Sequence, residues 1–235
     1  MKEPITTIYL IRHAEAEGNT KEIFQGHSDG AVSEKGRVQL EALSERCKQF
    51  PFEAVYSSPL QRAHETAEGA NLHYNLPIIV RDDLMEINGG VFEGNYWSEL
   101  PNLFPDEYSV WENSHHDFTI ENGESMREVF ARITNAIDEI AKENQGKVVA
   151  VVSHGCAIRN YLCYASGWPI ERVNEIVWCD NTAISRIDYD KNFTPHIIWQ
   201  NDSSHLSEDY STLIHQSWWR NDMADKGILD EDNGD

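Results

Sequence analysis

Basic residues are scarce in this sequence of 235 residues. It holds 19 Lys and Arg against 40 Asp and Glu, a formal net charge of −21. Such a charge repels polyanions at long range, so neither nucleic acid nor an anionic membrane is an expected partner. Any bound anion would need a local cluster of Arg and His side chains within a negative surface.

Long apolar runs are also missing. The run from Ile5 to Ile11 is interrupted by Thr and Tyr, and it is far shorter than the roughly 20 residues of a membrane-spanning helix. No basic segment with a cleavage site precedes it, which predicts a cytoplasmic protein. The four cysteines form neither a CxxC pair nor a zinc-type spacing, which predicts reduced and mostly buried thiols.

The segments that are present alternate between strand and helix. Strands are expected at Thr6–Ile11, Ala54–Tyr56, Ile78–Val80, Val148–Val152, Ala183–Tyr189 and His196–Gln200. Helices are expected at Ser33–Gln49, Ser58–Ala70, Ser125–Asn144 and from Gly155 toward Ala165. This order predicts an α/β fold, with a mostly parallel sheet covered by helices on both faces.

Two of these helices carry finer predictions. In the helix that Ser33 would cap, Val38, Ala42 and Leu43 form the expected inward stripe. In the next helix, Ser58 is the expected N-cap, with Pro59 at the first helical position.

The alternation fails between about Leu84 and Gly123, where Gly, Pro and aromatic residues dominate. We therefore expect a single domain over residues 1–222 with an inserted helical and loop cap at about 84–124. The acidic segment 223–235 is expected to be a mobile tail, and the sequence assigns no role to Trp218-Trp219.

Charged side chains follow two of the expected strands. Arg12 and His13 end the first strand, and His154 follows Val148–Val152. Ligands of open α/β sheets collect at the carboxyl ends of strands, so these residues are expected to share a pocket. Arg62 would join them from the first turn of its helix, a position suited to anions.

Two arginines and two histidines around one anion suit phosphoryl transfer, which needs an in-line nucleophile and fixed positive donors. An imidazole with a pKa near the reference value of about 6.5 can attack as the neutral ring, which makes His13 the candidate nucleophile. The candidate proton donor is Glu86, which would later deprotonate the attacking water. The scheme requires no metal and no cofactor.

At these residues the chain resembles the histidine phosphatase superfamily, in its phosphoglycerate mutase-like branch. The matching segments are Leu10-Ile11-Arg12-His13-Ala14-Glu15 with Asn19, Gln25-Gly26, Ser57 to Ala67, Leu84-Met85-Glu86 with Phe92-Glu93-Gly94, and Val152-Ser153-His154-Gly155. They come in the family's order and span most of Ile8 to Asn201.

The resemblance implies that His13 is phosphorylated and that Glu86 is the proton donor. It also implies that Arg12, Arg62 and His154 hold the phosphate, assisted by Asn19 and the Gln25-Gly26 backbone. The chain departs from many members at Ala14, where they carry Gly, which puts local backbone freedom in doubt.

Other interpretations of single motifs are weaker. Asp188-Tyr189-Asp190 is similar to the motif of aspartate-nucleophile phosphatases, but Lys191-Asn192 favours a hairpin turn. No cysteine has an Arg at the spacing that cysteine phosphatases use. His115-His116 lacks further ligands at metal-site spacing and is expected to be exposed in a loop. His64 is expected to face away from Arg62.

No Lys or Arg occurs between Arg81 and Arg127, where the cap would cover the pocket. The cap offers aromatic residues instead: Phe92, Tyr96, Trp97, Phe104, Tyr108, Trp111 and Phe118. We expect at least half of them simply to pack the cap onto the sheet. The rest suit a monophosphate whose remainder is neutral, apolar or aromatic.

The sequence therefore predicts a phosphomonoesterase of the histidine acid phosphatase type that acts on a small-molecule monophosphate. The alternatives left open are phosphoglycerate mutase activity and a non-catalytic module that binds phosphorylated partners. Homo-oligomerisation is possible but cannot be read from the sequence.

Overall fold

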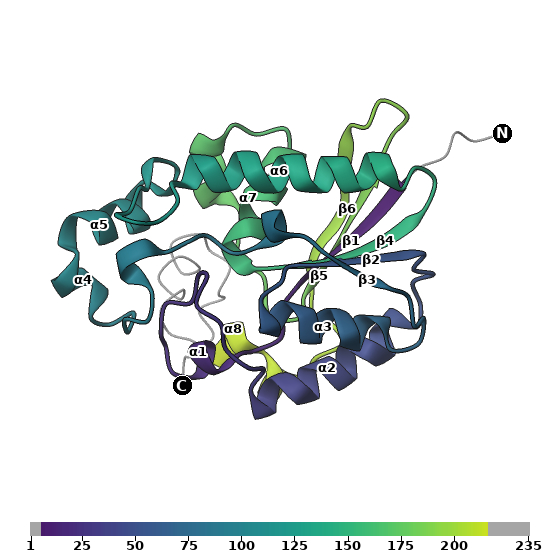
Figure 1. Cartoon of the computed structure of the whole chain (residues 1–235), viewed down its shortest axis with the longest axis horizontal. Helices are drawn as coiled ribbons and strands as arrows, with labels where there is room; N and C mark the ends of the chain where they lie inside the picture. Colours follow the sequence, from purple (N-terminus) through teal and green to yellow (C-terminus); the bar gives the residue numbers. More distant parts are fainter. Residues whose placement is uncertain (1–5, 216–235) are drawn as a thin grey trace, which may run out of the picture.

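The computed structural model describes residues 6–215, in which six strands form one sheet (Figure 1). The strands are β1 (Thr6–Arg12), β2 (Ala54–Ser57), β3 (Ile78–Val80), β4 (Val148–Ser153), β5 (Ile184–Tyr189) and β6 (Pro195–Asp202), in the order β3-β2-β4-β1-β5-β6. The first four strands are parallel, β5 runs antiparallel to β1, and β6 runs antiparallel to β5. The predicted fold is thus confirmed.

Helices cover both faces of this sheet (Figure 1). On one face lie α2 (Glu34–Cys47) and α3 (Gln61–Asn71), and on the other lie α6 (Met126–Glu143) and α7 (Gly155–Ala165). Side chains of β1 alternate between them: Ile8 and Leu10 join the core under α6 and α7, whereas Tyr9 and Ile11 join the core under α2 and α3. A strand buried on both faces reads as a continuous apolar run, which is why β1 and β4 could be found in the sequence.

The start of α6 shows how local chemistry sets a helix boundary. Ser125 is its N-cap and accepts a hydrogen bond from the amide of Glu128, whose carboxylate reaches back to the Ser125 amide. This capping box satisfies two amides that lack intrahelical partners. The buried stripe of α6 then follows helical spacing, as in Val129, Ile133 and Ile137.

The predicted inward stripe of α2 is wrong at Val38, which is 36% exposed. Leu43 is buried as predicted, but the buried face also holds Gln39, which the predicted stripe did not include. Gln39 belongs there because its side chain accepts a hydrogen bond from the Glu15 amide and donates one to the Tyr210 carbonyl. A buried polar residue with satisfied bonds is invisible to an analysis of apolar spacing.

The predicted N-cap of α3 is also wrong, because the helix begins at Gln61 rather than after Ser58. The amide of Gln61 donates to both carboxylate oxygens of Asp29, at 2.9 and 3.1 Å. The acceptor for this first helical amide therefore comes from a loop 32 positions earlier in the chain. The Ser58 hydroxyl accepts from the Leu60 amide at 3.3 Å, before the helix begins, and contacts Nε2 of His154 at 2.8 Å.

Residues 84–124 lie to one side of the sheet and contain α4 (Leu100–Leu103) and α5 (Pro105–Asn113) (Figure 1). Phe92 and Phe118 pack in a separate small core with Trp111. His115 is only 5% exposed and its ring lies 4.4 Å from that of Trp111, so the expectation of an exposed loop residue is wrong there. The His115 ring also lies 6.3 Å from that of Trp178, so it packs among aromatic side chains.

Two short helices complete the described chain, α1 (Glu17–Thr20) and α8 (Thr212–His215). All four cysteines are free and buried, as expected. Within residues 6–215, no helix combines the length and apolarity that crossing a membrane requires. The predicted tail at 223–235 and Trp218-Trp219 lie outside the described residues.

Candidate active site

The sheet brings together His13 and His154, which are 141 positions apart in the sequence. β1 and β4 are parallel neighbours in which Arg12 pairs with Ser153. The His13 amide donates to the Ser153 carbonyl at 3.0 Å, and the two imidazole rings lie 5.1 Å apart between centroids. Strand order therefore brings the two rings side by side, although of the two only His13 lines the cavity described below.

The side chain of His13 is held in one tautomer. Its Nδ1 lies 2.7 Å from the Ala14 carbonyl oxygen, which can only accept, so Nδ1 carries the proton. The Nε2 lone pair is then available for attack. Burial lowers the pKa of His13 well below 6.5, and the nearby charges of Arg62 and Arg12 lower it further. The ring is accordingly neutral at neutral pH.

The backbone that carries His13 is fixed by the turn that precedes β5. Asn181 donates through Nδ2 to the His13 carbonyl at 2.8 Å. The amide of Thr182, which adopts φ of 59°, donates to the Arg12 carbonyl at 3.1 Å. Ala14 is fully buried with negative φ, and its amide donates to Thr66. The departure at Ala14 therefore strains nothing locally.

Two buried guanidinium groups flank the pocket. Arg62 is the second residue of α3, as expected, and is 1% exposed. It donates to the carbonyl of Gly26 at 2.7 Å and to that of Ser28 at 3.0 Å. Arg12 is 4% exposed and donates to the Cys179 carbonyl. Charges held this deeply act on a ligand with little screening by solvent.

Glu93 orders the loop that holds Arg62. Its carboxylate accepts from the three amides of residues 26–28, at 2.8 to 3.1 Å, and from the Ser28 hydroxyl. Burial raises the pKa of Glu93, but these hydrogen bonds outweigh it and leave the pKa below its usual value. A Cβ on Gly26 would lie 2.1 Å from the Ile87 carbonyl oxygen, so only glycine fits. The Gly26 amide thus faces Glu93.

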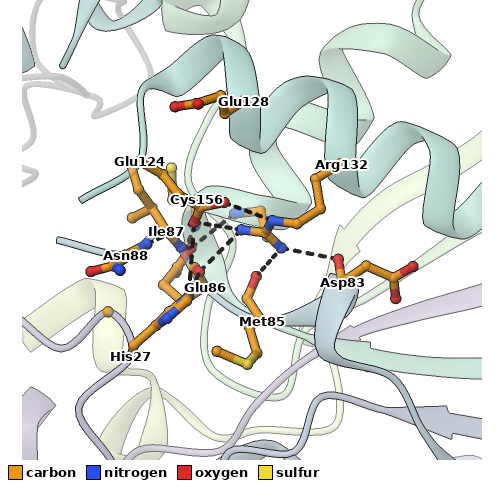
Figure 2. A network of polar contacts seen from close by, with 12 residues as sticks. His27, Asp83, Met85, Glu86, Ile87, Asn88, Glu124, Glu128, Arg132 and Cys156 are labelled. Carbon is orange, nitrogen blue, oxygen red and sulfur yellow. Dashed lines mark hydrogen bonds and ion pairs between the residues drawn. The ribbon is translucent and has the colours of Figure 1, made fainter. Parts of the chain in front are cut away.

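The Glu86 side chain packs against the N-terminal end of α7, and the residue is 9% exposed. Its carboxylate accepts from the amides of Ile87 at 2.9 Å, Cys156 at 3.0 Å and Ala157 at 3.1 Å. Figure 2 shows its place beside Cys156. The positive end of α7 therefore holds a carboxylate at the pocket wall.

His154 is fully buried beside His13. Its Nε2 lies 2.8 Å from the Ser58 hydroxyl, while its Nδ1 has no hydrogen-bond partner among residues 6–215. Burial lowers the pKa of His154 well below 6.5, followed by the charges of Arg62 and His13. Ser58 was missed as a partner because its sequence context resembles a helix cap.

One cavity collects most of the predicted site. Its polar wall is formed by Arg12, His13, Asn19, Gln25, Arg62 and Glu86. The Asn19 side chain also accepts a hydrogen bond from the Ala16 amide at 3.0 Å, a local contact at the start of α1. Two predicted site residues, Gly26 and the fully buried His154, do not line the cavity. His64 lies on the outside of α3, where it approaches Glu68 to 3.7 Å.

The remaining wall of the cavity is apolar. Trp97 and Trp111 from the cap line it, together with Phe24 and Trp178. Phe24 and Trp178 were missed, because they stand in irregular segments where no sequence period marks an inward side. Tyr96, by contrast, is 49% exposed.

Comparison with known proteins agrees with this geometry. The model of the histidine phosphatase superfamily (branch 1) matches residues 8–202. The chain belongs to this family. It is 30% identical over 206 residues to Phosphoserine phosphatase 1 of Hydrogenobacter thermophilus, covering 86% of this chain and 95% of that protein.

Two further relatives show how broad the family is. Phosphoglycerate mutase-like protein 4 of Arabidopsis thaliana is 31% identical over 204 residues, covering 86% of this chain and 87% of its own. The solved structure of Bacillus stearothermophilus YhfR superposes with a TM-score of 0.82 at 28% identity, covering 86% of this chain and all of that one. The predicted family and its phosphatase class of activity are confirmed.

Proposed function

We propose that this protein is a phosphoric monoester hydrolase of the histidine acid phosphatase type, acting on a small-molecule monophosphate with His13 as nucleophile. The observation that carries the proposal is the hydrogen bond from Nδ1 of His13 to the Ala14 carbonyl. It leaves the Nε2 lone pair for phosphorus, in a cavity that Arg12 and Arg62 make positive.

The reaction has two steps. Nε2 of His13 attacks phosphorus and the bond to the ester oxygen breaks, while Glu86 donates a proton to that oxygen. Water then attacks the phosphohistidine, the P–N bond breaks, and Glu86 takes a proton from the water. Arg12, Arg62 and His154 bind the equatorial oxygens, where charge is spread in the transition state. Asn19 and Gln25 complete the polar wall.

The cavity favours hydrolysis over phosphoryl exchange between two anionic substrates. Among the described residues, the cavity is lined by two basic side chains, Arg12 and Arg62. In this scheme both already bind the phosphoryl group. A mutase must hold a second anionic group. The aromatic wall suits a leaving group that is neutral, apolar or aromatic instead.

The test compares two reactions of the full-length protein. With p-nitrophenyl phosphate we expect free phosphate, and His13→Ala should abolish both turnover and covalent labelling by phosphate. With 3-phosphoglycerate plus 2,3-bisphosphoglycerate we expect little isomerisation. Rapid isomerisation with little phosphate release would instead make the protein a mutase. Absence of turnover with binding of phosphopeptides would make it a binding module.

Two accompanying proposals have their own checks. We expect activity to persist in EDTA, because no step needs a metal; loss of activity that Mg²⁺ or Zn²⁺ restores would contradict this. The cytoplasm remains the expected compartment, since free buried thiols suit a reducing environment. Fractionation of the source cells would test it.

A further inference from the structure

Met85 and Glu86 follow a short 3₁₀-helix and lie outside regular secondary structure, yet the backbone carbonyls around them are all hydrogen-bonded. Four consecutive carbonyl groups, those of residues 83–86, each accept a hydrogen bond from a side chain. Ser153 donates to the second of them at 2.8 Å. Arg132 donates to the other three, at 2.9 to 3.2 Å. Side chains therefore fix the path of this segment where it leaves the 3₁₀-helix Asp82–Leu84 and continues to Glu86.

Arg132 projects from α6 and uses its whole guanidinium group (Figure 2). Besides the three carbonyls, it forms two hydrogen bonds of 2.8 Å with the carboxylate of Glu124, through Nε and Nη2. These five contacts equal the number of N–H donors that an arginine has. A lysine offers three donors from one point and cannot reproduce them.

Glu124 extends the contact to the far side of Glu86. Its Oε2 accepts from the Asn88 amide at 2.8 Å, so the pair brackets the segment before and after the carboxylate. The side chains of Arg132 and Glu124 are 20% and 21% exposed, which limits screening of their ion pair. His27 adds one donor, from Nε2 to the Glu86 carbonyl at 2.9 Å.

We propose that Arg132 and Glu124 are positioning residues for the proton transfer by Glu86. The inference rests on the proposed function, since it gives the pair a role only if Glu86 donates the proton. Proton transfer requires the donor and the ester oxygen to be within hydrogen-bond reach, so a small displacement of the carboxylate slows it. The pair binds neither the phosphoryl group nor the leaving group.

The first test measures how the rate depends on the leaving group. Substituted phenyl phosphates of similar size are hydrolysed by wild type, Glu86→Gln and Arg132→Met, and kcat/KM is compared because it reports transfer to His13. We expect Arg132→Met to reduce kcat/KM by about 10- to 100-fold for poor leaving groups, within the roughly 10² to 10⁴-fold range of a general acid. Good leaving groups, which need no proton, should show little change.

A second test asks whether Arg132 acts through Glu86. Arg132→Met is introduced into the Glu86→Gln protein, and the effects of the two substitutions are compared singly and together. If Arg132 only positions the carboxyl group, its loss should cost little once that group is gone. Additive losses in the double variant would overturn the proposal, because Arg132 would then contribute independently of Glu86.

The controls separate this role from general damage to the fold. Arg127 also lies on α6, is 53% exposed, and contacts Glu171 and Asp117 rather than the Glu86 segment. Arg127→Met should leave the leaving-group dependence unchanged. Should Arg132→Met fail to fold, Arg132→Lys and Glu124→Gln weaken the same contacts more mildly and should show the same selective loss.

The two proposals fail in different ways. If Glu86→Gln loses equal rate on good and poor leaving groups, Glu86 is not the acid and the proposed mechanism falls. If Glu86→Gln shows the selective loss but every Arg132 and Glu124 variant loses rate uniformly, the mechanism stands and the positioning role is wrong.

Discussion

At His13 a single hydrogen bond decides which nitrogen can react. The Ala14 carbonyl fixes the proton on Nδ1, and burial with two neighbouring arginines keeps a second proton off the ring. This arrangement needs no separate base to prepare the nucleophile. It also explains why the positive groups serve two purposes, since they attract the substrate and keep its attacker neutral.

The tautomer leads to a spectroscopic prediction. In protein labelled with ¹⁵N-histidine, the His13 signals, identified by their loss in His13→Ala, should show Nδ1 protonated and Nε2 unprotonated down to pH 6. The reason is that the pKa of His13 is lowered well below 6.5. A ring that gains its second proton near pH 6.5, as free imidazole side chains do, would contradict this.

Aromatic residues at the cavity give a second prediction at this scale. The Trp178 ring lies 4.6 Å from the guanidinium carbon of Arg159, which holds it in place. Trp178→Ala should raise KM for phenyl phosphate about 2- to 13-fold, the equivalent of the roughly 0.5–1.5 kcal/mol of one aromatic contact. KM for ethyl phosphate should change little. Tyr96→Ala, outside the cavity, is the control, and an equal rise with both substrates would exclude stacking.

Sequence reasoning succeeded for residues that end strands or begin helices. Arg12 and His13 were predicted to lie at the cavity because the carboxyl ends of parallel strands share an edge, and Arg62 because it stands in the first turn of a helix. It failed for Trp178 and for the Arg132 contacts. Trp178 itself and the carbonyl partners of Arg132 at residues 85 and 86 stand in irregular segments, where no sequence period marks which residues face inward.

Among the elements, α3 depends on a residue outside itself. The Asp29 carboxylate accepts from the Gln61 amide and also lies near enough to Arg62 to raise the pKa of its guanidinium, against the lowering by burial. One loop residue thus accepts the hydrogen bond of the first helical amide and places a negative charge near Arg62, which binds phosphate in the proposed scheme. The sequence placed the helix correctly but its cap incorrectly, because Ser58-Pro59 is itself a strong local signal.

This dependence predicts the effect of changing Asp29. Asp29→Ala should lower the free energy of unfolding by about 1 kcal/mol, the usual cost of losing a side-chain acceptor at a helix start. Asp29→Asn keeps an acceptor oxygen and should lose less. Urea denaturation of the three proteins measures the difference. Equal stability of wild type and the alanine variant would show that water replaces the carboxylate without cost.

On the scale of the whole molecule, a net charge of −21 surrounds a cavity that is locally positive. Strand order contributes to this contrast, since the carboxyl ends of β1 and β4 lie side by side and Arg12 and His13 line the cavity there. The burial of histidine side chains also lowers the stability of the fold at acidic pH. His13, His154 and His205 all have a pKa lowered by burial.

The sign of that cost follows from proton binding. As the pH falls below about 6.5, these histidines gain protons in the unfolded chain but not in the folded one, so the unfolded state is favoured. Each fully buried histidine lowers the free energy of unfolding by up to about 1.4 kcal/mol per pH unit between its two pKa values. Urea denaturation between pH 7.5 and 5.5 should show this slope, and His154→Asn should reduce it. Trp178→Ala, which removes no titratable group, should leave the slope unaltered; a slope that survives His154→Asn intact would assign the acid sensitivity to other groups.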